Sequence, residues 1–201
     1  MLRNFLKFST TDHMTADAQR KEQSQKKKRK TVKKITESRL KNIALYYLQR
    51  FSATEHSLRQ VLERRLKKAK YAHDPSDTDW EQWNTWVDKV VALCLDYGFV
   101  NDENYAKQKI RAMLAQGKSF RLIQMKLKEK GVATETTSAL LDDLAEDTNL
   151  IAAQTFVRRK KLGPYRPPEK QADFYEKDLA KLARAGYSYQ IAREVLKPSD
   201  Q

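Results

Sequence analysis

Residues 127–132 read LKEKGV, and they decide the fold because a related ending returns as LARAGY at residues 182–187. In both stretches a leucine closes a basic amphipathic pattern, and a glycine follows four residues later. Residues 66–71, LKKAKY, form a third copy in which Lys70 occupies the glycine position. The leucines are 61 and 55 residues apart, a spacing that spans several helices and predicts a repeat architecture. A repeat array offers an extended surface, which suits binding a partner better than enclosing a small substrate.

Positive charge is concentrated near the N-terminus of the chain. The 201 residues have a formal net charge of +14, and residues 1–41 contain 13 Lys or Arg against 4 Asp or Glu. Such a field attracts polyanions, namely nucleic acid, acidic protein surfaces or anionic lipid. The single cysteine fits a reducing compartment, and no apolar run approaches the roughly 18 residues of a membrane-spanning helix. The opening residues lack the hydrophobic core of a targeting signal, so we expect a cytoplasmic protein with no membrane partner.

Apolar residues recur with helical spacing through most of residues 37–197, and no segment alternates long enough to predict a strand. Residues 1–36 are polar and rich in lysine, so they cannot bury enough apolar surface to offset chain entropy. The sequence predicts an all-α protein in which three tandem three-helix units form an elongated, curved array behind a disordered basic N-terminal arm. The expected boundaries are 1–36 for the arm and 37–100, 101–146 and 147–197 for the three units.

Local signals predict several helix ends. Ser52 and Thr78 are each followed three residues later by glutamate, which is the spacing of a capping box, and Asn101 is a good N-cap. Gly98 predicts a left-handed cap at the end of the preceding helix. A later helix is expected to stop at Gly163, where the next residue is proline.

Nothing in the sequence predicts catalysis. Residues 117–119, Gly-Lys-Ser, resemble the end of a phosphate-binding loop, but the earlier glycine of that motif is missing, so a turn between helices fits better. The histidines are scattered, and Cys94 falls on an apolar helix face, where a buried and inert thiol is expected. The carboxylates of residues 142–147 fit a solvated edge or the start of the next helix. We therefore expect no enzymatic activity, no cofactor, no metal and no small-molecule substrate.

Basic residues gather in all three predicted units and in the arm. If the units stack regularly, these clusters line one side as a positive track that follows a phosphate backbone or an acidic groove. The competing interpretation is that they solvate ordinary exposed helix faces. The residues expected to contact a protein partner are Arg64, Arg65, Lys68, Arg111, Arg121, Lys126, Arg158 and Arg159. The residues expected to contact nucleic acid are Lys26, Lys27, Lys28, Arg29, Lys30, Lys33 and Lys34.

Three regions of the chain resemble the RecX family, the regulators of the RecA recombinase. Residues 38–66 are similar to the first unit of the family, and residues 98–132 to its middle unit. Residues 158–166 and 178–196 resemble the third unit of α-proteobacterial members. The basic arm and Lys70 depart from the family pattern. In the middle unit, the matching positions are Gly98, Asp102, Tyr105, Ala106, Arg111, Gly117, Leu127 and Gly131.

The resemblance implies a bent, all-α modulator that is not an enzyme and that lies along the helical groove of the RecA–DNA filament. Such proteins suppress filament growth, ATP hydrolysis, strand exchange and coprotease activity, and they have some affinity for DNA. On this basis we expect a monomer whose main partner is the RecA filament and whose binding to DNA is weaker and non-specific. The alternative is a non-specific nucleic-acid-binding protein acting through its arm and helix faces. A helical scaffold for another acidic protein is the third interpretation.

Overall fold

The computed structural model describes residues 32–197, and residues 35–197 belong to one compact unit. Every regular element in this described part is a helix, so the prediction of an all-α fold is confirmed. The predicted disordered arm lies almost wholly outside the described residues. Near its end, Ile35 is buried and the Thr36 side chain accepts a hydrogen bond from the Arg39 N–H, which caps the first described helix.

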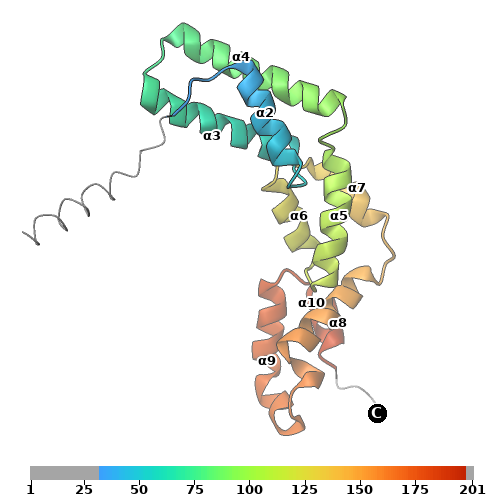
Figure 1. The fold of residues 1–201 in the computed structure, drawn as a ribbon. Helices are drawn as coiled ribbons and strands as arrows, with labels where there is room; N and C mark the ends of the chain where they lie inside the picture. The colour runs from blue at the N-terminus through green and yellow to red at the C-terminus, as the bar shows by residue number, and fades with distance from the viewer. Residues whose placement is uncertain (1–31, 198–201) are drawn as a thin grey trace, which may run out of the picture. The chain divides into compact units, whose positions relative to one another are not determined.

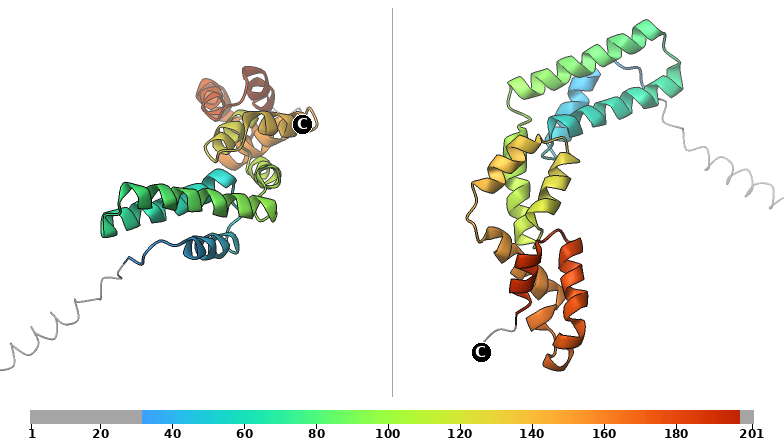
Figure 2. Two further views of the ribbon diagram at one scale, coloured as in Figure 1. Left: turned by 90° about the horizontal axis from the view of Figure 1, so that it is seen from above. Right: turned by 180° about the vertical axis from the view of Figure 1, so that it is seen from behind.

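Most contacts between helices fall within three groups, which Figures 1 and 2 show from several sides, and α5 also contacts α8 across two of these groups. The first group contains α2 (Glu37–Leu48), α3 (Glu55–His73) and α4 (Asp77–Asp96). The second group contains α5 (Asp102–Ala115), α6 (Phe120–Lys128) and α7 (Thr134–Asp142). The third group contains α8 (Thr148–Lys160), the short 3-10 helix η1 (Gly163–Tyr165), α9 (Pro168–Arg184) and α10 (Tyr189–Val195). The boundaries between the three predicted units stay predictions.

The three repeated leucines lie inside their own groups. Leu66, Leu127 and Leu182 are all fully buried, as the helical spacing of the sequence predicts. Trp83 and Cys94 are buried on α4, so the expectation of a buried thiol is confirmed. Burial raises the pKa of the Cys94 thiol, which disfavours the reactive thiolate.

Two predicted helix starts are wrong, and the structure shows why. The capping hydroxyl of α3 belongs to Thr54 instead of Ser52. The helix α4 begins two residues earlier than expected, because Ser76 and Asp79 form a reciprocal capping box. The prediction of an N-cap at Asn101 is confirmed by its side chain, which accepts the N–H of Asn104 at 2.8 Å.

The ends of α6 and α9 have the same backbone geometry. After α6, Gly131 adopts a φ of +80°, and the N–H of Val132 donates to the Leu127 carbonyl at 3.1 Å. After α9, Gly186 adopts a φ of +89° and the same pattern of bonds follows. This is a Schellman ending, in which a left-handed residue lets the chain turn back onto the last carbonyls of the helix. The repeated glycines are therefore explained by backbone geometry.

The first copy of the ending departs from this pattern. Lys70 occupies the glycine position, and α3 continues through it to His73. The helix ends only at Asp74, which takes a left-handed φ of 43°. This copy therefore lacks the left-handed turn of the other two, because lysine favours the helix where glycine favours the left-handed turn. The other helix that ended differently is α8, which stops at Lys160, slightly before the expected Gly163.

The start of α3 is bonded to the second group, at a contact that we call the first joint (Figure 1). The hydroxyl of Thr54 accepts the N–H of Ser57 at 3.1 Å and donates to the Lys130 carbonyl, just after α6, at 2.5 Å. Beside it, the N–H of Glu55 donates to the Asp102 carboxylate at 2.8 Å. The start of α3 thus finds two of its hydrogen-bond partners in the second group.

The start of α6 repeats this arrangement with the third group, at the second joint. The hydroxyl of Ser119 accepts the N–H of Leu122 at 3.3 Å and donates to the Ala185 carbonyl, just after α9, at 2.6 Å. The N–H of Phe120 donates to the side-chain oxygen of Asn149 at 3.3 Å. Residues 117–119 therefore form the turn that the sequence predicts, and Ser119 in addition caps α6.

The glycine of each joint leaves space for the neighbouring group. A Cβ atom on Gly131 would lie 2.3 Å from the Cβ of His56, and one on Gly186 would lie 2.7 Å from the Ser119 hydroxyl. Gly98 also has a left-handed φ, of +69°, but a Cβ there would meet nothing within 4 Å. The joint glycines are therefore constrained by both backbone and neighbour, whereas Gly98 is constrained by backbone alone.

We predict that Gly131→Ala destabilises the protein more than Gly98→Ala. The control variant bears only the strain of a left-handed alanine, about 1 kcal/mol. The joint variant must also push His56 aside, so its expected total cost is about 2–4 kcal/mol. Urea unfolding followed by circular dichroism measures both. Equal losses of unfolding free energy in the two variants would show that the close approach of His56 to Gly131 adds nothing to the cost of the substitution.

Candidate protein-binding surface

All eight residues predicted to contact a protein partner are exposed. They lie on four helices of the three groups, and several stand in the last turn of α6 or α8, where a positive charge also favours the helix dipole. Their arrangement as one continuous track stays a prediction. By helix, they are Arg64, Arg65 and Lys68 on α3, Arg111 on α5, Arg121 and Lys126 on α6, and Arg158 and Arg159 on α8.

Two of these arginines make bonds within the protein. The Nε of Arg64 donates to the Gln60 carbonyl one turn earlier, at 3.2 Å. The guanidinium of Arg159 donates to the Gln116 carbonyl at 2.7 Å, which ties the end of α8 to the C-cap of α5. Arg159 therefore stabilises a helix end, because that carbonyl has no partner within its own helix.

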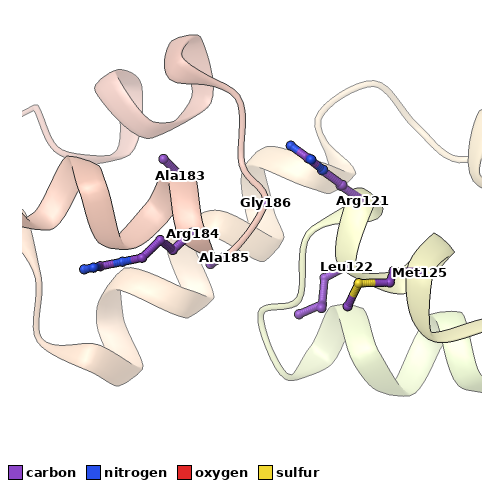
Figure 3. A pocket seen from close by; sticks show the side chains of 7 residues that line it. All are labelled: Arg121, Leu122, Met125, Ala183, Arg184, Ala185 and Gly186. Atoms are coloured by element: carbon purple, nitrogen blue, oxygen red, sulfur yellow. The ribbon is translucent and has the colours of Figure 1, made fainter.

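Arg121 lies in a groove beside the second joint, together with a residue that the sequence analysis missed, Arg184 (Figure 3). The groove has a volume of about 570 Å³ and runs between α6 and the end of α9. Lys126 does not line it, because it stands five positions after Arg121 and so faces another side of α6. The signal for Arg184 was its place two residues before the repeated glycine. The residues that line the groove are Arg121, Leu122, Met125, Ala183, Arg184, Ala185 and Gly186.

The nucleic-acid-binding prediction falls mostly on residues that the structure does not describe. Lys26, Lys27, Lys28, Arg29 and Lys30 lie outside the described residues. Lys33 and Lys34 are described, and both are exposed. Their contact with nucleic acid stays a prediction.

One charged pair of the third group is structural. The Asp178 side chain is only 1% exposed, and its two oxygens accept bonds from the Arg166 guanidinium at 2.6 and 2.7 Å. The Gly163 N–H donates to the same carboxylate at 3.0 Å. Burial alone would raise the pKa of Asp178, but Arg166 and the Gly163 N–H outweigh it and hold the pKa below 3.8. This pair fastens residues 163–166 onto α9.

Among the described residues 32–197, no group of His, Cys, Asp or Glu side chains is arranged to hold a metal ion. Within the same residues, no helix is long and apolar enough to cross a membrane. The carboxylates of residues 142–147 are exposed, and Asp147 forms the N-cap position of α8.

The fold and these surfaces define an all-helical protein whose candidate binding residues lie on its exterior. Comparison with known proteins names the family. A model of the second three-helix domain of RecX matches residues 101–141. The regulatory protein RecX of Myxococcus xanthus (strain DK1622) is 36% identical over 169 residues, covering 83% of this chain and 89% of that protein. The regulatory protein RecX of Agrobacterium fabrum (strain C58) is 32% identical over 156 residues, covering 78% and 80%. This chain belongs to the RecX family of regulatory proteins.

A solved structure supports the fold. The crystal structure of RecX from Lactobacillus salivarius aligns with a TM-score of 0.56 and 19% sequence identity, covering 80% of this chain and 94% of that chain. Several positions that carry the resemblance now have a structural role. Asp102 and Gly131 belong to the first joint, and a Cβ on Gly117 would lie 2.7 Å from the backbone nitrogen of Phe156 on α8.

We predict that Asp178→Asn lowers the midpoint of thermal unfolding at pH 7 by about 5 °C, because the partly buried Arg166 guanidinium then loses the carboxylate with which it pairs. The lowered pKa means that the folded protein binds this proton less readily than the unfolded chain does. The stabilisation is therefore complete above about pH 4 and declines as the pH falls through the folded pKa. Calorimetry of both proteins at pH 7 and pH 3 should show the difference shrinking at pH 3. A difference that is independent of pH would contradict this assignment.

Proposed function

We propose that this protein regulates the RecA recombinase, mainly as an inhibitor, by binding along the RecA–DNA filament. Membership of the RecX family of regulatory proteins, across more than three quarters of the chain, is the observation that carries this proposal. The protein suppresses ATP hydrolysis, strand exchange and coprotease activity, and thereby modulates DNA repair and the SOS response. It acts by occupying the filament, and no chemistry of its own is required.

The distribution of charge supports a mechanism in which several weak contacts act together. Exposed basic residues occur in each of the three helix groups, and the two joints link the groups through matching hydrogen bonds. When one group is bound to a filament subunit, the linked groups are held at a high effective concentration near the next subunits. Each contact can therefore be weak while the whole chain binds firmly enough to obstruct subunit motion or filament growth.

Non-specific binding to nucleic acid is the second candidate function, and the N-terminal charge favours it. Residues 1–41 hold 13 of the 40 Lys and Arg residues of the chain. Binding through phosphates would weaken steeply with salt, with a slope of about −0.7 to −0.9 per contact. Removal of residues 1–31 should flatten that slope if the arm contacts DNA. An unchanged slope would exclude residues 1–31 from the DNA contact.

We predict that substoichiometric amounts of the protein inhibit single-strand-dependent ATP hydrolysis by the cognate RecA. Reversing two charges of α3, with Arg64→Glu and Arg65→Glu together, should raise the half-inhibitory concentration by about fivefold to tenfold. Lys170→Glu with Arg193→Glu is the matched control, because it changes the net charge equally on exposed residues outside the predicted contacts. Equal loss in both variants would indicate a response to net charge alone. Inhibition that needs saturation of the DNA, and that extra DNA relieves, would favour the nucleic-acid-binding function.

A further inference from the structure

The two joints share their hydrogen bonds but differ in the side chains around them. When the two sequence segments are aligned on their capping residues, Thr54 and Ser119, His56 corresponds to Arg121 and Gln60 to Met125. On the other side of the joint, Glu129 corresponds to Arg184. The capping hydroxyl makes the same bond to the carbonyl of the next group in both joints, and none of the replaced side chains takes part in that bond.

At the surface of the first joint, polar side chains contact each other. The side-chain nitrogen of Gln60 lies 2.8 Å from the Nε2 of His56, within hydrogen-bonding distance. His56 also covers Gly131, whose Cβ position it nearly touches. With Glu129 as the corresponding residue on the other side, all three of these positions are polar, and one of them is an acidic residue.

The second joint presents a different surface in the same place. Met125 is 51% exposed, and it lies beside Leu122 on α6, as Figure 3 shows. The groove lining contains two arginines and no acidic residue. Exposed apolar surface framed by charge is a feature of sites that bind other molecules. Methionine suits such a site because its flexible, polarisable side chain adapts to the shape of an apolar partner.

The two arginines indicate an extended ligand. In Figure 3 the side chains of Arg121 and Arg184 extend in different directions, so their guanidinium groups do not converge on one small anion. Guanidinium groups bind carboxylates in a bidentate geometry. The volume of about 570 Å³ is in the range of pockets that hold drug-sized ligands. None of the lining residues is aromatic, so the groove offers no ring on which a nucleic-acid base could stack.

We propose that the groove at the second joint binds a short segment of a protein partner in which acidic residues flank a large apolar side chain. The apolar side chain lies on Leu122 and Met125, and the carboxylates meet Arg121 and Arg184. This inference deepens the proposed function and rests on it for the identity of the partner, the RecA filament. The recognition chemistry itself follows from the groove alone.

The direct test uses a synthetic peptide of glutamates interrupted by leucine and phenylalanine, titrated into the full chain labelled with ¹³C at the methionine methyl groups. The peptide should shift the Met125 methyl resonance, which Met125→Gln identifies by its loss. A glutamate peptide of the same charge without the apolar residues should bind about tenfold more weakly. No shift with the first peptide, or a shift produced only by oligothymidylate, would overturn the proposal.

The first joint supplies the matched control for mutagenesis. Arg184→Glu places in the second joint the residue that already occupies the same position in the first joint, so it should fold normally. It should weaken peptide binding by about tenfold or more. Glu129→Arg makes the opposite exchange at the first joint and should leave binding at the groove unchanged within about twofold. Binding that Arg184→Glu does not weaken would overturn the proposal.

Inhibition of RecA by the same variants separates this proposal from the proposed function. If the wild-type protein inhibits RecA and Arg184→Glu inhibits equally well, the groove proposal fails while the function stands. If the wild-type protein binds the peptide through the groove but does not affect RecA, the function fails and the groove remains a peptide-binding site. Parallel loss of peptide binding and of inhibition in Arg184→Glu supports both.

Discussion

The arrangement of the helix groups depends on a helix-capping hydroxyl that accepts one hydrogen bond and donates another. Thr54 and Ser119 each accept an N–H from their own helix and donate their proton to a carbonyl of the next group. The carbonyl is available because the helix that carries it has just ended in a left-handed glycine. The hydroxyl, the carbonyl and the glycine therefore lie together at each joint.

The need for both a capping hydroxyl and a glycine explains why the described residues form joints only between neighbouring groups. At the start of α9, the N-cap position is held by Pro167, which has no hydroxyl to offer to a further group. At the end of α3, Lys70 replaces the glycine, and the helix runs on past the place where a preceding group would be joined. The outer ends of the first and third groups thus each lack one half of the joint. Because the joints use backbone and buried atoms, the surface around them is free to vary, and it does so between His56 and Arg121.

Much of the fold could be predicted from local sequence. Helical periodicity identified the buried leucines, and the glycine endings identified the turns after α6 and α9. Ser52 was mistaken for the cap of α3 because the deciding bond joins Thr54 to Lys130, far away in the sequence. The basic residues predicted to contact a partner are exposed, but their neighbours could not be foreseen from the sequence. The bond from Arg159 to Gln116 and the pairing of Arg121 with Arg184 both depend on packing between groups.

Hydrogen exchange measured by mass spectrometry on Ser119→Ala tests most directly whether the shared hydroxyl holds the groups together. Loss of the joint should speed exchange in α9 and α10, while α2, α3 and α4 keep the protection of the wild-type protein. Ser188→Ala is the control, because Ser188 caps α10 and its side-chain oxygen accepts the N–H of Ile191 within the same group. If Ser119→Ala changes exchange only in the first turn of α6, as the loss of a simple cap would, then the hydroxyl does not join the groups.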